Sequence, residues 1–298
     1  MAVMSNDAMR TTALTDHRIE LPDGRILGAT EFGDPDGPAV VLLHPAPGSR
    51  LLDPDPAATA AAGVRLIGID RAGYGASTAL PAGAVPTVSG HADDIAAALA
   101  ALGVDEAAVV GWSAGGRVAL ALAARHAGLV RSVAVVGTPA PEEDVPWIPE
   151  EHLGLIEQLK GDPGSATGVL APVFAEMADA PPAAAVGMVG AGPADEAALD
   201  TDPARRARLE AMLAESFAQG AVGMAADIVS YTVVPWGFDP TSVGARTTAF
   251  YGEGDVMISP AHGEWYVSQV PGAELRLVPD AGHLVALTAW ADILAAVA

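Results

Sequence analysis

The sequence contains no cysteine, which excludes disulfide bonds, thiolate nucleophiles and cysteine-ligated metal sites. Positive charge is also scarce, because 15 Lys and Arg residues stand against 37 Asp and Glu residues, for a net charge of −22 at pH 7. A surface this acidic repels phosphate backbones and anionic lipid head groups, so we expect neither a nucleic-acid partner nor a membrane partner. No uninterrupted apolar run approaches the roughly 18 residues of a membrane-spanning helix. The first ten residues lack the basic start and apolar core of a secretory signal, which predicts a cytoplasmic protein.

What the chain does have is apolar material, at 51% of its 298 residues, which is enough to bury a large core and excludes a disordered chain. Short apolar runs of strand type alternate with segments of helical period, and this alternation predicts an α/β fold with a mainly parallel sheet and helices on both faces. The predicted strands cover residues 17–21, 25–32, 39–43, 64–69, 107–110, 132–136, 247–251 and 274–278, and the predicted helices cover 92–102, 115–126 and the chain from Val285 onward.

The alternation breaks after Gly137, and residues 139–244 form a helical, Pro- and Gly-punctuated segment. We interpret this segment as a helical cap inserted into one α/β core made of residues 17–138 and 245–298, with residues 1–16 as a flexible N-terminus. The segment holds 17 acidic residues against 4 basic ones, a charge of −13. We expect this charge to solvate the outer face of the cap and to disfavour polyanionic substrates.

A glycine-flanked serine connects a predicted strand to a predicted helix. Residues 111–115 read Gly-Trp-Ser-Ala-Gly, directly after the strand at 107–110 and at the start of the helix at 115–126. A sharp turn at this place puts Ser113 in a strained backbone conformation and raises its hydroxyl above the sheet edge, which requires small neighbours on both sides. The pentapeptide alone is also compatible with a helix-capping serine in a glycine-rich turn, but the strand before it and the helix after it favour a nucleophile.

The chain therefore resembles a serine-nucleophile member of the α/β-hydrolase superfamily, with a helical cap after the sixth strand. The resemblance spans about residues 17–298. Residues 44–49 are similar to the H-G-x-P-G-S loop of that family, with Pro45 where glycine is usual. The resemblance implies an oxyanion hole made of the backbone N–H groups of Ala46 and Ala114, and a cis peptide between Ala46 and Pro47.

A second loop, at residues 70–77, resembles the D-R-P-G-Y-G-x-S loop of the same family, with Ala72 in place of proline. We assign this loop a structural role, because its glycines permit tight turning. Asp70 and Arg71 are expected to form a local ion pair.

Serine needs a positioned base that is itself oriented by an acid, and on this fold the chain order is serine, acid, histidine. Asp255 follows the strand at 247–251, and His283 follows the strand at 274–278 in an Asp-Ala-Gly-His segment. The resemblance therefore predicts Ser113, Asp255 and His283 as a catalytic triad. Glu253 and Asp280 lie on the same two loops as alternative acids, and some relatives place the acid after the sixth strand, where this chain has Glu142, Glu143 and Asp144.

The resemblance implies a hydrolase of carboxylic esters, lactones or related acyl compounds that works through an acyl-enzyme, with a small apolar acyl or ring compound as substrate. No cofactor or metal is expected, since the sequence has no H-E-x-x-H segment. Two alternatives stay open, namely a lyase or cyclase on the same fold and a ligand receptor with low turnover. Oligomeric state is not determined. The residues expected to line a substrate pocket are His44, Pro47, Trp112, Trp147, Trp236 and Leu284.

Overall fold

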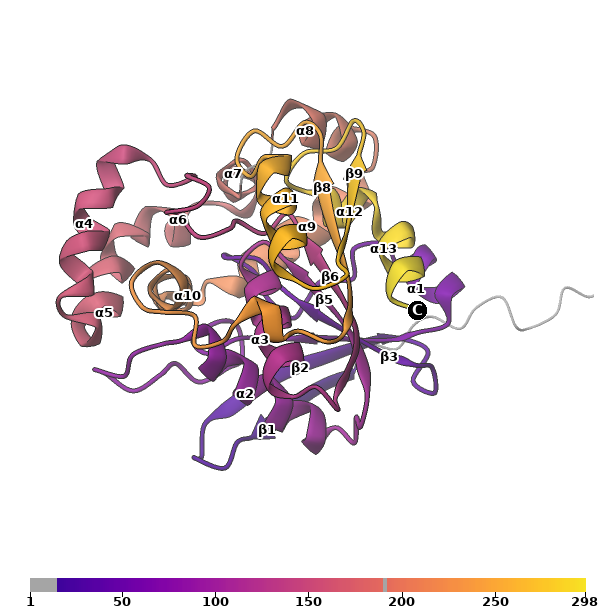
Figure 1. Ribbon diagram of the computed structural model, residues 1–298, viewed down its shortest axis with the longest axis horizontal. Helices are drawn as coiled ribbons and strands as arrows, with labels where there is room; N and C mark the ends of the chain where they lie inside the picture. Colours follow the sequence, from indigo (N-terminus) through magenta and orange to yellow (C-terminus); the bar gives the residue numbers. More distant parts are fainter. Residues whose placement is uncertain (1–14, 190–191) are drawn as a thin grey trace, which may run out of the picture.

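The computed structural model describes residues 15–189 and 192–298, and its centre is an eight-stranded sheet in the order β1-β2-β4-β3-β5-β6-β8-β9 (Figure 1). The second strand pairs antiparallel with both of its neighbours, and the remaining pairs are parallel. The predicted α/β class is thus confirmed. The strands are β1 (Thr15–Glu20), β2 (Ile26–Gly33), β3 (Ala39–Leu43), β4 (Arg65–Ile69), β5 (Ala107–Trp112), β6 (Val130–Val136), β8 (Arg246–Gly252) and β9 (Glu274–Val278).

The N-terminal strand begins two residues before the predicted start of the core, at Thr15. It therefore includes the end of the stretch 1–16 that we expected to be flexible. Residues 1–14 of that stretch lie outside the described residues.

Helices cover both faces of the sheet, and the inner strands β3, β4, β5, β6 and β8 are buried on both faces for this reason, whereas the edge strands β1 and β9 are mostly exposed. Val41 and Val109 pack toward one layer of helices, whereas Val40 and Val110 pack toward the other. The first layer holds α2 (Val88–Ala101), α3 (Ala114–Arg125) and α11 (Pro260–Gln269); the second holds α1 (Pro56–Ala62), α12 (Val285–Thr288) and α13 (Trp290–Val297). The sequence prediction missed α1 and α11, and the predicted C-terminal helix is broken at Ala289.

The segment between β6 and β8 is helical, as predicted, and it packs as two groups of helices rather than one. Four of its helices begin with proline, which suits the first helical position because the missing N–H has no partner there. Its elements are α4 (Glu150–Lys160), α5 (Pro163–Val173), α6 (Ala175–Asp179), α7 (Pro182–Met188), α8 (Pro193–Asp200), α9 (Pro203–Ser216), the short strand β7 (Ala218–Ala221), α10 (Val222–Thr232) and the 3₁₀ turn η1 (Pro240–Ser242).

One group, made of α4, α5 and α10, has an apolar core of its own, to which Leu159, Leu170 and Val229 contribute. The other group contributes to the second layer of the main core through Val186 of α7 and Leu209 of α9. Figure 1 shows the first group extending to one side of the sheet, and α8 lies against the loop that follows β9. Among the described residues, none of the helices is both long and apolar enough to span a bilayer.

A buried carboxyl group between β3 and α1 predicts an unusual pH dependence of stability. Asp53 is 6% exposed, and its side chain accepts a hydrogen bond from the Thr59 hydroxyl. Burial raises the pKa of Asp53 to about 6, although the Thr59 hydrogen bond partly opposes the rise. A carboxyl whose pKa is higher in the folded than in the unfolded chain favours folding while protonated and opposes it once ionised.

We therefore expect Asp53→Asn to be more stable than the wild type at pH 8, by roughly 2–3 kcal/mol. The advantage should shrink as the pH falls through 6 toward 4, because the folded wild-type carboxyl then takes up a proton and no longer carries a buried charge. Urea denaturation at a series of pH values measures this difference. A difference that stays constant with pH would show that Asp53 does not titrate in this range.

Candidate active site

Ser113 lies in the sharp turn between β5 and α3, with a backbone φ of 52°. The strained conformation predicted for this residue is therefore present. A Cβ atom added at Gly111 would lie 2.4 Å from the Gly115 carbonyl oxygen, and one added at Gly115 would lie 2.2 Å from the Leu43 carbonyl oxygen. Both flanking positions thus require glycine, as the sequence predicted.

The imidazole of His283 connects the Ser113 hydroxyl to the Asp255 carboxylate. Its Nε2 lies 3.2 Å from Ser113 Oγ, and its Nδ1 lies 2.9 Å from Asp255 Oδ2. The other oxygen of Asp255 accepts the backbone N–H groups of Met257 and Ile258, which fix the carboxylate. Because Nδ1 faces a carboxylate, it carries the ring proton, and the Nε2 lone pair is left for the serine hydroxyl. The arrangement can therefore take a proton from Ser113.

The other acids that the sequence offered as partners of His283 either bond other groups or are exposed to solvent. Glu142 accepts the backbone N–H groups of the segment 147–148, and Asp144 accepts the indole N–H of Trp265. Glu253 and Asp280 are exposed to solvent. Within the described part of the chain, Asp255 is the acid whose side chain bonds the His283 ring.

The loop that carries Ala46 has the expected cis peptide between Ala46 and Pro47. Ala114 is the first residue of α3. Among hydrogen bonds of residues 15–189 and 192–298, neither the Ala46 nor the Ala114 backbone N–H donates to a protein acceptor. Both amides are thus available to an oxygen atom of a bound molecule.

Comparisons with known proteins agree with this fold. A model of the alpha/beta hydrolase fold family matches residues 38–289. The chain belongs to this family. It is 29% identical over 238 residues to the pimeloyl-[acyl-carrier protein] methyl ester esterase of Chromobacterium violaceum, an alignment that covers 77% of this chain and 81% of the relative.

Two solved structures show the same fold. A hydrolase from Pseudomonas aeruginosa PA01 superposes with a TM-score of 0.71 at 22% identity, over 95% of this chain and 96% of that one. A thermophilic esterase from Thermogutta terrifontis superposes with a TM-score of 0.67 at 21% identity, over 95% of this chain and 96% of that one. The chain therefore spans nearly the full length of other alpha/beta hydrolases.

The local ion pair expected between Asp70 and Arg71 of this alpha/beta hydrolase does not form. Asp70 instead pairs with Arg50, at 2.9 Å between Oδ2 and Nη1, and Arg71 pairs with Asp227 of α10. Each of the two neighbours is thus paired with an oppositely charged side chain from elsewhere in the chain. The Arg71 guanidinium also donates to the carbonyl oxygens of His44 and Pro45, at 2.7 and 3.1 Å, and so holds the loop that carries the candidate oxyanion donor Ala46.

His44 is enclosed next to Arg71 and is 1% exposed. Its Nε2 accepts the backbone N–H of Arg71 at 3.2 Å, and its ring lies edge-on against Tyr74. Burial and the positive charge of Arg71 hold the pKa of His44 well below its ordinary value, so the ring is neutral. These contacts give His44 a role in ordering the loop.

Two acids of the insert were missed as site residues, because we expected the charge of the insert to face solvent. Asp227 is 2% exposed and Asp195 is 1% exposed. Asp195 accepts backbone N–H groups from residues 282–284, on the loop of His283. Burial alone would raise the pKa of Asp227, but the charge and hydrogen bonds of Arg71 outweigh it and lower that pKa. The insert is thus fastened to two loops of the site by buried carboxylates.

The residues predicted to line one substrate pocket do not gather around any one cavity described for this alpha/beta hydrolase. Trp112 and Leu284 belong to the core, at 0% and 1% exposed. Pro47 is also buried. Trp147 lines an apolar cavity of about 180 Å³, and Trp236 lines a different cavity of about 540 Å³. The fold therefore separates aromatic side chains that the sequence could not distinguish.

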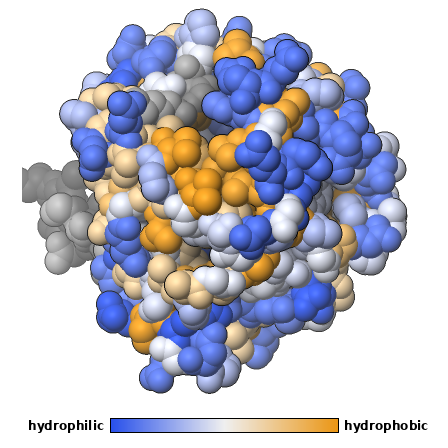
Figure 2. All heavy atoms as spheres, turned by 90° about the vertical axis from the view of Figure 1, so that its left-hand side faces the viewer, coloured by the Kyte–Doolittle hydropathy of each residue, from blue (hydrophilic) through white to orange (hydrophobic). Residues whose placement is uncertain are grey.

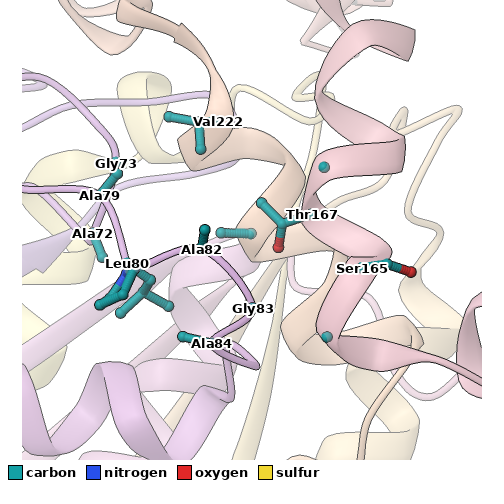
Figure 3. A pocket seen from close by; sticks show the side chains of 14 residues that line it. Ala72, Gly73, Ala79, Leu80, Ala82, Gly83, Ala84, Ser165, Thr167 and Val222 are labelled. Atoms are coloured by element: carbon teal, nitrogen blue, oxygen red, sulfur yellow. The ribbon is translucent and has the colours of Figure 1, made fainter.

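Besides the cavity at Trp236, two cavities lie along the helices of the insert. The apolar one is formed by α4, α5 and α10, and Leu153, Val169 and Val173 are exposed on the first two of these helices. Figure 2 shows apolar side chains gathered in the middle of the face seen from that side. The other, of about 510 Å³, lies between the loop 79–84 and α5, from which Thr167 points toward the loop (Figure 3). Neither cavity is lined by Ser113 or His283.

Proposed function

We propose that this alpha/beta hydrolase is a serine hydrolase of carboxylic esters, lactones or related acyl compounds. In this proposal Ser113 is the nucleophile, His283 the general base and Asp255 the orienting acid. The observation that supports it most directly is the chain of hydrogen bonds from Ser113 Oγ through the His283 ring to Asp255, at 3.2 and 2.9 Å. The esterase names of two of the relatives are consistent with this class of reaction.

In the first half of the reaction, His283 Nε2 takes the Ser113 proton while Oγ attacks the substrate carbonyl carbon. The backbone N–H groups of Ala46 and Ala114 stabilise the resulting oxyanion. Loss of one such donor costs about 10²–10³ in rate in enzymes of this kind. The tetrahedral adduct then expels the alcohol, which takes its proton from His283, and leaves an acyl group on Ser113.

In the second half, His283 takes a proton from water, and the resulting hydroxide attacks the acyl carbonyl. A second tetrahedral adduct releases the carboxylic acid, and Ser113 recovers its proton from His283. The Nδ1 proton stays on His283 throughout, and Asp255 accepts its 2.9 Å hydrogen bond and stabilises the imidazolium. No group other than water is needed to balance either half.

The charges around the site favour a neutral carbonyl substrate. Arg71 lies beside the loop of Ala46, but Asp227 neutralises it within the same buried cluster. With a net charge of −22, the protein also repels anionic substrates at long range. We therefore propose an uncharged ester or lactone group at the reacting position.

Hydrolysis of nitrophenyl esters with acyl chains of two to sixteen carbons tests the proposal. We expect turnover with an optimum at one range of chain length, and an added acyl mass on Ser113 when a slow substrate is stopped with acid and digested. Carbon–carbon cleavage or proton exchange without an acyl adduct would point to a lyase or cyclase instead. Saturable binding with negligible turnover would point to a receptor.

A further inference from the structure

The carboxylate of Asp195 is buried at the start of α8 and faces the loop of His283. It accepts the backbone N–H groups of Gly282, His283 and Leu284 at 3.1, 3.0 and 3.1 Å, and that of Gly192 on its own helix at 3.0 Å. No Lys, Arg or His side chain in the described part of the chain forms an ion pair with it. Four amide donors therefore stabilise a buried negative charge in place of a cation.

The carbonyl oxygen of His283, in the same peptide segment, is also hydrogen-bonded. The indole N–H of Trp112, which precedes Ser113, donates to the carbonyl oxygen of His283 at 3.0 Å. The backbone of His283 is thus fixed through its N–H by the insert and through its carbonyl by the nucleophile turn. Its ring is oriented separately by Asp255. Together these contacts determine where Nε2 meets Ser113 Oγ.

We propose that Asp195 is a positioning residue, which sets the place of the His283 main chain and hence the contact between Nε2 and Ser113. This inference rests on the proposed function, since it gives His283 the role of general base. Without the carboxylate, three backbone N–H groups on the His283 loop lose their acceptor, and the loop must move to find another. A displacement of about 1 Å in such a contact can cost about 10²-fold in rate. In this proposal the insert, through Asp195, helps to position the base that activates Ser113.

The lack of a side chain at Gly282 is separate evidence for the close contact between Asp195 and the His283 loop. A Cβ atom added there would lie 2.2 Å from Asp195 Oδ2, and its three nearest atoms all belong to the Asp195 carboxylate. Gly282 is not among the residues with positive φ, so its backbone conformation is open to alanine. The carboxylate, and not the backbone, therefore requires glycine at this position.

The test is the rate at which a fluorophosphonate labels Ser113, followed by intact mass. We expect Asp195→Asn and Asp195→Ala to lower this rate by about 10- to 100-fold. On an ester substrate the loss should fall on kcat with KM nearly unchanged, because the substrate contacts are intact. Asp202→Asn is the matched control, since Asp202 caps α9 of the same insert by accepting the N–H of Arg205. It should label within about twofold of the wild type.

A double-mutant comparison separates positioning from general damage. Gly282→Ala alone is expected to slow labelling, because its Cβ displaces the carboxylate. In the Asp195→Ala background the same change should cost little more, because the clashing atoms are gone. If Asp195→Ala does not fold, the test uses Asp195→Asn and Gly282→Ala, which leave no cavity at this position. Thermal melts are recorded for each variant.

Hydrogen exchange of the 282–284 amides gives a readout that needs no activity, and we expect exchange to accelerate in Asp195→Asn. The positioning role alone would be overturned if folded Asp195 variants were labelled as fast as the wild type. It would also be overturned if the effects of the Asp195→Ala and Gly282→Ala mutations on the labelling rate were additive. A wild-type protein that resists labelling would instead overturn the proposed function, and the positioning role with it. The two failures are thereby distinguishable.

Discussion

Replacement of Ser113 with alanine is expected to lower kcat for ester hydrolysis by about 10³- to 10⁶-fold. The alanine keeps the Cβ atom of the turn but removes the oxygen that lies 3.2 Å from His283 Nε2, so no acyl-enzyme can form. We expect the thermal midpoint to stay close to that of the wild type, because the change leaves the flanking glycines and the strand–helix connection intact. Steady-state kinetics on the best nitrophenyl ester measures the loss.

Ser132→Ala is the matched control for this prediction. Ser132 is a buried serine on the neighbouring strand β6, and its hydroxyl donates to the Val297 carbonyl. Its loss should affect stability and leave kcat nearly unchanged. The effects of mutating residues that act together in one catalytic step are not additive. The double variant Ser113→Ala, His283→Ala should therefore have a kcat no lower than that of either single variant. Undiminished turnover by Ser113→Ala would show that another group is the nucleophile.

Replacement of Asp227 with alanine is expected to destabilise the fold by about 3–5 kcal/mol, because it leaves the Arg71 guanidinium buried without a counter-charge. Arg71 Nε lies 2.9 Å from Asp227 Oδ1, and Arg71 Nη2 lies 2.5 Å from Oδ2. The Tyr74 hydroxyl donates to the same carboxylate at 2.9 Å. Urea denaturation at pH 7 measures the loss.

The same substitution should also reduce turnover. Arg71 holds the His44 and Pro45 carbonyls of the loop that carries Ala46, and an Arg71 side chain that has lost its partner can shift that loop. The control is Arg206→Ala, which removes a more exposed pair with Glu196 in the insert and should leave the denaturation midpoint nearly unchanged. Replacing both Arg71 and Asp227 with apolar residues should cost less stability than removing Asp227 alone.

The pH dependence gives a further check on this pair. Arg71 lowers the pKa of Asp227 below its ordinary value, so the stability that the pair contributes is present at neutral pH. It is lost as the pH falls through the lowered pKa of the folded state. The difference in unfolding free energy between the wild type and Asp227→Asn should therefore be largest near neutrality and should shrink in acid. An effect of equal size at all pH values would mean that the charge of Asp227 does not matter.

The sequence by itself determined the features whose causes lie within a few neighbouring residues. The apolar run of β3 was predicted with its observed bounds, because burial at every position of a central strand leaves a continuous local signal. The sharp turn at Ser113 could be predicted in the same way, since the constraints on Gly111, Ser113 and Gly115 come from the turn and from the strand next to it. The order of Ser113, Asp255 and His283 followed from the resemblance to a family, and no local pattern would have joined them.

Only the tertiary structure decided which polar residues of the insert belong to the site. Asp195, Asp200 and Glu176 are all acids on short helices, yet Asp195 is buried while the other two are exposed. Asp195 lies on the same helix face as Leu199, which was the one local hint of its burial. Arg71 reaches a partner 156 residues away in preference to its neighbour Asp70.

Such pairings depend on how whole helices pack against the loops at the end of the sheet. That packing is decided by the summed burial of apolar faces, and the charged groups then pair with whatever donor or acceptor the packing brings within reach. The periodicity of apolar residues along the sequence does not indicate which charged groups the packing brings together. The sequence therefore determined the sheet and the sharp turn at Ser113, whereas the tertiary structure alone placed Asp195 on the His283 loop and Asp227 on Arg71.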